Sequence, residues 1–139
     1  LIKYKYMLKD REIYKNRETK LIWKEVCPFC DLEWQWDCVI WKWKYWYIQH
    51  NMYPYLWLKD HIMAIPYSHK VFANELSSEE FSEMRDVQKF IKDFYWNKEY
   101  FSFMRETLWK RSIEHLHYQY LPWVLRTSRI EKILKEQGF

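Results

Sequence analysis

The chain of 139 residues contains a single glycine, Gly138. Loops that wrap closely around a phosphate group, such as the Walker A loop and the Rossmann GxGxxG loop, need glycine where the backbone approaches the ligand. This sequence can form neither loop. Folds that bind nucleotides through such loops are therefore excluded.

Composition predicts one globular domain over residues 1–139. The length fits the range of about 100–200 residues typical of one domain, and 49% hydrophobic with 30% charged residues is ordinary. The 10 Trp, 12 Tyr and 8 Phe make up 22% of the chain, so we expect a core of few, large side chains. The net charge of +4 mildly favours anionic ligands such as nucleotides, and it is too small to indicate a duplex-binding surface.

We expect a cytoplasmic protein that makes no membrane contact. No uncharged apolar stretch approaches the roughly 18–20 residues that cross a bilayer, and residues 1–6 lack the apolar run of a signal peptide. Three cysteines are an odd number, and two of them form the motif Cys27-Pro-Phe-Cys30. Here this motif indicates half of a metal site or a redox pair rather than a disulfide framework.

Hydrophobic patterning predicts an α+β fold, with helices against one face of an antiparallel sheet. β-Branched and aromatic runs favour strands at residues 38–47, 61–66, 99–106 and 113–121. Ser77 and Glu80 form a capping box at the start of a long helix. A short helix is predicted over residues 127–137, ending at Gly138. The long helix has a core-facing stripe at helical spacing: Phe81, Met84, Val87, Ile91 and Phe94.

Residues 113–121 carry the most informative polar pattern. Because side chains alternate along a strand, His115, His117 and Gln119 share one face, and the apolar residues between them face the other way. Two imidazoles and an amide side by side are an unusual surface for a strand. On spacing alone, a polar sheet face with two titrating histidines is an equally good interpretation.

The two cysteines of the motif can chelate one Zn²⁺, but a structural zinc site needs four ligands. Cys38 lies in a strand-like run, so its expected role is packing. The other ligands would come from the five histidines, and a redox pair or coincidence stay open at this point. The histidines are His50, His61, His69, His115 and His117.

Four segments, in order, resemble the histidine triad (HIT) superfamily of nucleotidyl hydrolases and transferases. They are the Asn51-Met-Tyr-Pro54 stretch, the run from His61 through Pro66 to His69, the acidic capping-box helix, and the strand from Ser112 to Pro122. The resemblance covers residues 27–122, with residues 1–26 as a basic N-terminal extension and 123–139 as a C-terminal tail. It implies a HIT-like antiparallel sheet with one long helix and a short C-terminal helix.

The resemblance to the zinc-carrying branches of this superfamily implies a role for each matching residue. A structural Zn²⁺ would be held by Cys27, Cys30, His69 and His115. His117 would be the nucleophile that attacks the α-phosphorus and forms a nucleotidyl-histidine, a covalent route that splits one hard displacement into two easier ones.

The third position of the signature is Gln119, as in galactose-1-phosphate uridylyltransferase and the dinucleoside polyphosphate phosphorylases, which use His-x-His-x-Gln. Its amide can donate to a phosphoryl oxygen without titrating. By the same resemblance, Ser112 contacts phosphate, Asn51 lies near the ribose and His61 lines the nucleotide pocket. Arg111 replaces a glycine of the family and would supply a guanidinium for phosphate.

We therefore expect a HIT-type nucleotidyltransferase or hydrolase that acts on a nucleotide-containing small molecule and, by resemblance, forms a homodimer. The alternative is a catalytically silent, zinc-stabilised module with the same fold that binds nucleotides or RNA, which the missing glycines, positive charge and abundant aromatics would suit. Nucleic acid is a partner only in that alternative. A third interpretation treats the two signature histidines as incidental.

Overall fold

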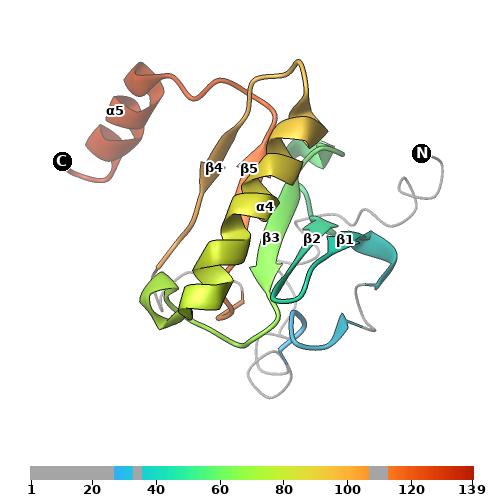
Figure 1. Ribbon diagram of the computed structural model, residues 1–139. Coiled ribbons are helices and arrows are strands. Elements are labelled where there is room, and N and C mark those ends of the chain that lie inside the picture. Colours follow the sequence, from blue (N-terminus) through green and yellow to red (C-terminus); the bar gives the residue numbers. More distant parts are fainter. Residues whose placement is uncertain (1–26, 33–35, 107–112) are drawn as a thin grey trace.

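The structure is a computed structural model, and it describes residues 27–32, 36–106 and 113–139. Five antiparallel strands form one sheet in the order β1-β2-β3-β5-β4 (Figure 1). The two α-helices of the described residues are α4 (Ser78–Tyr95) and α5 (Thr127–Glu136). The predicted α+β architecture, with one long helix and a short C-terminal helix, is confirmed. The strands are β1 (Val39–Lys42), β2 (Trp46–His50), β3 (Ile62–Pro66), β4 (Phe101–Phe103) and β5 (Tyr118–Leu121).

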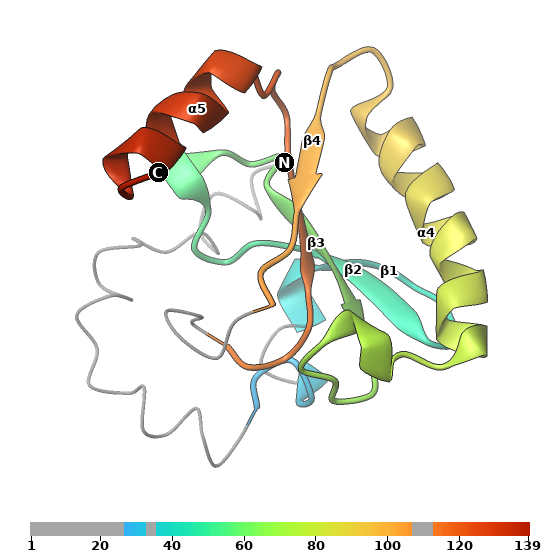
Figure 2. The same ribbon diagram turned by 90° about the vertical axis from the view of Figure 1, so that its left-hand side faces the viewer.

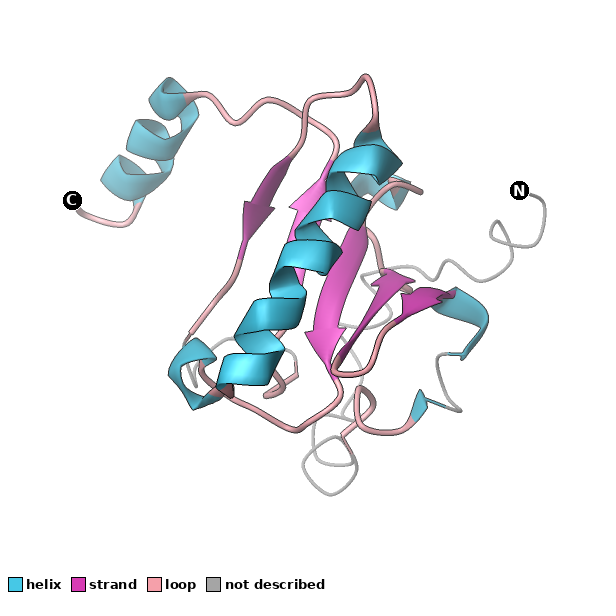
Figure 3. Ribbon diagram, viewed as in Figure 1, coloured by secondary structure: helices cyan, strands magenta, loops and turns pink. Residues whose placement is uncertain are grey.

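Helix α4 lies across one face of the sheet (Figure 3). Alternation along the strands sends every second side chain into a core beneath this helix, and the intervening ones into a smaller core on the opposite face. The larger core contains Trp46, Ile62 and Tyr120 together with Val87 and Ile91 of α4. The smaller core consists of Phe29, Tyr47, Met63 and Ile65. The segment that carries the two motif cysteines thus covers the face opposite α4.

The capping box at the start of α4 forms as predicted. The Glu80 amide donates to the Ser77 hydroxyl at 3.1 Å, and the Ser77 amide donates to the Glu80 carboxylate at 3.0 Å. The predicted core stripe is wrong at its first member, because Phe81 is 51% exposed and Glu80 takes the inward position. One residue rotates the side chain by about 100° around a helix, so these neighbours cannot share a face.

Residues 38–47 form a hairpin rather than the one continuous strand that was predicted. The turn between β1 and β2 is held by the Glu83 carboxylate of α4, which accepts hydrogen bonds from the backbone N–H groups of Lys44 at 3.0 Å and Tyr45 at 2.6 Å. Cys38 ends a short 3-10 helix (Trp36–Cys38) and is buried outside the strand. The stabilising group comes from a distant helix, so no local turn residue is needed.

Two other strands are shorter than predicted. Of residues 99–106 only Phe101–Phe103 pair, and of residues 113–121 only Tyr118–Leu121 do. Strand β3 ends at Pro66, and the Leu116 N–H donates instead to the Lys70 carbonyl at 2.6 Å. The alternation nevertheless continues before β5, because Leu116 lies in the larger core whereas His115 and His117 contact Phe29 of the smaller one.

Helix α5 projects beyond the β4 edge of the sheet, on the side away from α4 (Figure 2). Its predicted apolar side forms, and it lies at the surface, with Ile130, Ile133 and Leu134 38%, 49% and 43% exposed. The helix ends as predicted before Gly138, whose φ of +91° is a conformation that glycine adopts readily. Among the residues that the structure describes, no helix is long and apolar enough to span a bilayer.

Candidate functional site

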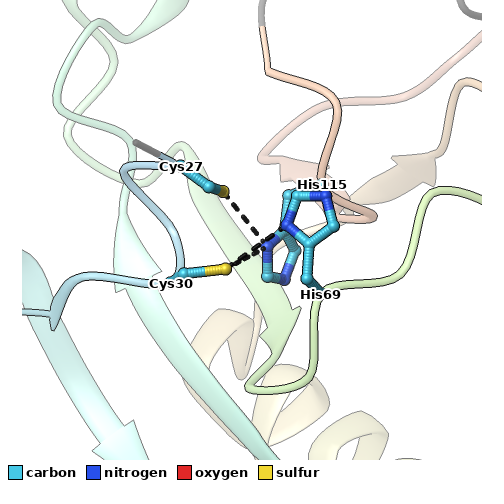
Figure 4. A group of neighbouring side chains, drawn as sticks. All are labelled: Cys27, Cys30, His69 and His115. Carbon is cyan, nitrogen blue, oxygen red and sulfur yellow. Dashed lines mark hydrogen bonds between the residues drawn. The ribbon is translucent and has the colours of Figure 1, made fainter. Parts of the chain in front are cut away.

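Two thiols and two imidazoles converge at one end of the sheet, on the face opposite α4 (Figure 4). The ligand atoms of Cys27, Cys30, His69 and His115 all lie within 4.8 Å of one another. The Nδ1 atom of His115 is 3.3 Å from Cys27 Sγ and 3.5 Å from Cys30 Sγ, and His69 Nδ1 is 3.3 Å from Cys30 Sγ. A tetrahedral zinc ion with ordinary bond lengths places its sulfur and nitrogen ligands about 3.6 Å apart. These four residues therefore fit a metal ion in spacing and in donor chemistry.

Three separate segments bring these ligands together. A tight turn, in which the Cys30 N–H donates to the Cys27 carbonyl at 3.1 Å, aims both thiols the same way. His69 follows the end of β3, and His115 lies just before β5. Since β3 and β5 are hydrogen-bonded neighbours, the sheet itself sets the distance between the two histidines.

The His115 ring is oriented for metal binding by a second hydrogen bond. It is fully buried, and its Nε2 lies 2.7 Å from the carbonyl oxygen of Pro66. A carbonyl oxygen only accepts, so Nε2 carries the proton and Nδ1 presents its lone pair to the cysteines. Burial lowers the pKa of His115 to about 4 despite that hydrogen bond, which keeps the ring neutral and able to act as a ligand.

Ionisation of the Cys30 thiol is disfavoured at this site. Desolvation and the neighbouring Cys27 raise the pKa of the Cys30 thiol. A divalent cation reverses this effect, because thiolates are the form that binds metal and their protons are released on binding. Cys38, the third cysteine, is buried and lies outside the cluster, in agreement with its predicted packing role.

The His117 ring lies close to the cluster and takes a different orientation. Its Nδ1 is 2.7 Å from the carbonyl oxygen of His115, two residues earlier. The Nδ1 atom therefore donates, and the lone pair is on Nε2. The ring of Phe29, which lies between the motif cysteines, contacts His117 edge-on at 5.2 Å and His115 at 5.8 Å. This aromatic contact joins the thiol turn to both histidines.

A buried polar network lies next to the two signature histidines, His115 and His117. His61 Nε2 is 2.8 Å from Gln119 Oε1 and 3.3 Å from Asn51 Nδ2. The Tyr55 N–H donates to His61 Nδ1 at 3.2 Å, and the Tyr55 ring packs on the imidazole at 4.7 Å. Asn51 accepts the Tyr53 N–H through Oδ1 at 2.8 Å, which fixes its amide. The residues between β2 and β3 thus close over Gln119.

Structural comparison identifies the fold. A HIT family hydrolase from Legionella pneumophila Philadelphia 1 matches with a TM-score of 0.56 and 16% identity over 72% of this chain and 95% of that chain. The fold is that of the HIT proteins. A histidine triad nucleotide-binding protein from Candida albicans matches with a TM-score of 0.53 and 14% identity, covering 81% of this chain and 96% of that one.

A hypothetical protein from Leishmania major is similar in structure to this chain, with a TM-score of 0.60 and 15% identity over 82% of this chain and 94% of that one. Neither a protein-family model nor a curated protein sequence matches the chain. The likeness to HIT proteins is therefore one of fold, and the chemistry has to be argued from the side chains.

On this HIT fold the predicted residues fall into two neighbouring groups. The four expected metal ligands lie together, and Asn51, His61 and Gln119 form the adjacent network. The two predicted phosphate contacts, Arg111 and Ser112, lie outside the described residues. Several tryptophans lie between residues 34 and 46. Trp46 is fully buried, Trp41 and Trp43 contact Phe90 of α4, and Trp34 is outside the described part.

Sequence analysis missed three partners of the site. Phe29 could have been found, since it is a large apolar residue inside the Cys27-Pro-Phe-Cys30 motif. In the structure its side chain is 3% exposed. The backbone groups of Pro66 and Tyr55 carry no side-chain signal, so a sequence pattern does not reveal their hydrogen bonds to the histidines.

Proposed function

We propose that the protein is a HIT-type nucleotidyltransferase or nucleotide hydrolase that acts through a covalent bond between His117 and the α-phosphorus of its substrate. One observation carries the proposal, namely the 2.7 Å hydrogen bond from His117 Nδ1 to the His115 carbonyl. It sets the tautomer that a nucleophilic imidazole needs, with the lone pair on Nε2. The HIT fold of the chain supports the same class of chemistry.

In the first step His117 Nε2 attacks the α-phosphorus, and the bond from phosphorus to the bridging oxygen of the leaving group breaks. The leaving group keeps the electron pair of that bond. The phosphorylated ring gains positive charge and keeps its Nδ1 proton, which the His115 carbonyl stabilises. In the second step an oxygen of water, phosphate or a phosphate ester attacks the same phosphorus, the phosphorus–nitrogen bond breaks and His117 leaves as neutral imidazole. When water attacks, its proton passes to solvent.

The substrate-binding roles belong to the neighbouring polar residues. Gln119 donates from its amide to a non-bridging phosphate oxygen, which becomes more negative as the new bond forms. Arg111 and Ser112 bind phosphate, and Asn51 and His61 belong to the nucleotide side of the site. The ligand is a nucleotide-containing small molecule.

The metal in this proposal is zinc in a structural role. Two thiolates and two imidazoles without a carboxylate or an open position are the ligand set of a closed structural site. Cys27, Cys30, His69 and His115 would hold the ion, whose coordination stabilises the ring of His115 and the backbone next to His117. None of the steps above passes through the metal.

We also propose a homodimer. Strand β4 forms one edge of the sheet, and the segment that follows its neighbour β5 carries exposed apolar side chains. Trp123 is 75% exposed, and Val124 and Leu125 are 47% and 44% exposed. Exposed apolar clusters of this kind mark protein interfaces. Sedimentation velocity would test the dimer directly, and a monomer at micromolar concentration would contradict it.

Intact mass under mildly alkaline conditions tests the nucleophile, because a phosphoramidate on histidine is acid-labile. The wild type and His117→Ala are mixed briefly with UDP-sugars, dinucleoside polyphosphates and nucleoside phosphoramidates. A gain of one nucleoside monophosphate on the wild type alone is expected, with metal content equal in both proteins. Substrate consumed without an adduct, again by the wild type alone, supports a hydrolase whose intermediate breaks down quickly.

The silent binding module predicts a different result. All substrates would stay intact, and His117→Ala would bind nucleotide as tightly as the wild type. Such a result would overturn the catalytic proposal and leave the fold and the metal site in place.

A further inference from the structure

His61 has a defined protonation pattern that follows from its neighbours. It is fully buried, and its Nδ1 accepts a hydrogen bond of 3.2 Å from the backbone N–H of Tyr55. A backbone N–H can only donate, so Nδ1 must present a lone pair. A neutral imidazole carries one proton, and here that proton is on Nε2. A second proton on the ring would place two donors against each other at Nδ1.

This tautomer fixes the amide of Gln119. The Nε2–H of His61 needs an acceptor, and Gln119 Oε1 lies 2.8 Å away. The opposite amide orientation would put the NH₂ group against the Nε2–H. The Asn51 amide nitrogen lies farther from the same Nε2, at 3.3 Å, and as a donor it cannot accept this proton, so the shorter contact to Gln119 is the hydrogen bond. Gln119 therefore has its oxygen held inward and its nitrogen as the remaining polar atom.

We propose that His61 is a positioning residue that holds the Gln119 amide with its N–H bonds toward a phosphate oxygen of the substrate. This inference rests on the proposed function, which places phosphate beside His117. It gives His61, on the nucleotide side of the site, a role that acts through Gln119, in keeping with its fully buried ring. Without the hydrogen bond the Gln119 amide can rotate by 180° and present its oxygen, which repels an anionic phosphate.

The chain of contacts runs from backbone to ligand. The residues between β2 and β3 supply the Tyr55 N–H and the Tyr55 ring that packs against His61, and β5 supplies Gln119. Neither His61 nor Gln119 needs to change its protonation state during the reaction. The pair thus offers a preorganised neutral donor, which costs no reorganisation when negative charge develops on the phosphate.

The first test is a tautomer measurement that does not depend on activity. Long-range ¹H–¹⁵N spectra of histidine-labelled protein should show His61 with its proton on Nε2 at neutral pH. In His61→Phe the side-chain NH₂ signals of Gln119 should shift and broaden, whereas His61→Gln, which keeps a donor near the Nε2 position, should preserve them. An Nδ1–H tautomer, or Gln119 signals that ignore the loss of the imidazole, would overturn the proposal.

The second test uses the rate of His117 nucleotidylation in a single turnover. His61→Phe should slow this rate by about tenfold or more, as expected for a misplaced transition-state donor, while nucleotide affinity changes by less than threefold. His61→Gln should recover part of the rate. In a Gln119→Ala background His61→Phe should cause no further loss, because His61 acts through Gln119.

His50→Gln is the matched control, because His50 also bonds to this region of backbone, through Nδ1 and the Lys59 carbonyl at 2.9 Å. Its rate should equal that of the wild type. Equal and additive losses from His61→Phe and Gln119→Ala would contradict the positioning role. If the wild type reacts with no substrate, the proposed function fails, and the tautomer and Gln119 spectra still decide whether His61 positions the amide.

Discussion

The hydroxyl of Tyr47 donates a 2.8 Å hydrogen bond to the carbonyl oxygen of Phe29. This bond ties β2 to the turn that carries Cys27 and Cys30. Tyr47 is fully buried, and burial raises the pKa of its hydroxyl, so the donor stays protonated. The position of the thiols is thus set from within the sheet as well as by the turn.

Tyr47→Phe should weaken both metal binding and folding. The substitution keeps the ring and leaves the Phe29 carbonyl without its donor, which costs about 1–3 kcal/mol for a buried acceptor. Metal affinity should fall by about 10–100-fold, as for other groups that orient ligands. Urea unfolding and a competition titration with a zinc chelator measure the two effects. Tyr120→Phe is the control, since its hydroxyl bonds to Gln88 on the opposite face and its loss should leave metal affinity unchanged.

Cys27→Ser and His69→Ala should abolish stoichiometric zinc binding, whereas Cys38→Ser should retain it. A ligand that binds only the folded state stabilises it by about 2.7 kcal/mol at a free concentration of 100 Kd. Zinc should therefore raise the Tm of the wild type and of Cys38→Ser and leave the other two unchanged. Elemental analysis and calorimetry check this together. Equal metal content in all four proteins would show that zinc binds elsewhere.

Glu80→Gln should destabilise the protein in a pH-dependent manner. Burial alone would raise the pKa of Glu80, but hydrogen bonds from Ser77 and from Ser68, the latter at 2.7 Å, outweigh it and lower the pKa. A carboxylate with a lowered folded-state pKa contributes stability that is complete above its unfolded value and disappears as pH falls through the folded value. The Tm difference from the wild type should thus be full above pH 4.5 and shrink below it.

The exposed Glu79, one residue earlier, provides the control for this series. Glu79→Gln should follow the wild-type Tm profile closely. A difference between Glu80→Gln and the wild type that stayed constant from pH 7 to pH 2 would show that Glu80 contributes by its shape and not by its charge.

Glu83→Ala should loosen the hairpin of β1 and β2. The carboxylate accepts hydrogen bonds from two backbone N–H groups. A hydrogen bond to a charged group contributes about 1.5–3 kcal/mol to folding stability. Because the turn is partly exposed and water can replace the carboxylate, a total loss of about 1–3 kcal/mol is expected. Hydrogen exchange at Lys44 and Tyr45 should accelerate, while Asp86→Asn, on the next turn of α4, should leave it unchanged. Unchanged exchange in Glu83→Ala would exclude this role.

The elements that sequence analysis predicted best are those with local signals. The capping box of Ser77 and Glu80 and the break at Pro66 mark the ends of α4 and β3, because each acts within one turn of backbone. The β1–β2 hairpin was missed because its turn depends on Glu83, 38 and 39 positions along the chain from the two amides that it binds.

The candidate site divides in the same way. The four metal ligands were identified through a resemblance that includes their spacing, and the structure brings them together. The buried position of His61 against Gln119 joins residues 58 positions apart. The tautomer of His61 depends on one backbone N–H. Neither this tautomer nor the contact with Gln119 can be predicted from the amino-acid types alone. Local chemistry is visible in a sequence, but the hydrogen-bond partner that orients it is not.

The 88 positions between Cys27 and His115 also set an order of events during synthesis. A nascent chain that has emerged only as far as the end of α4 contains Cys27, Cys30 and His69. The fourth donor arrives after β4, and its place is fixed only when β5 inserts between β3 and β4. Complete coordination is therefore restricted to chains that extend through β5, and products truncated before His115 would hold the ion with three donors at most.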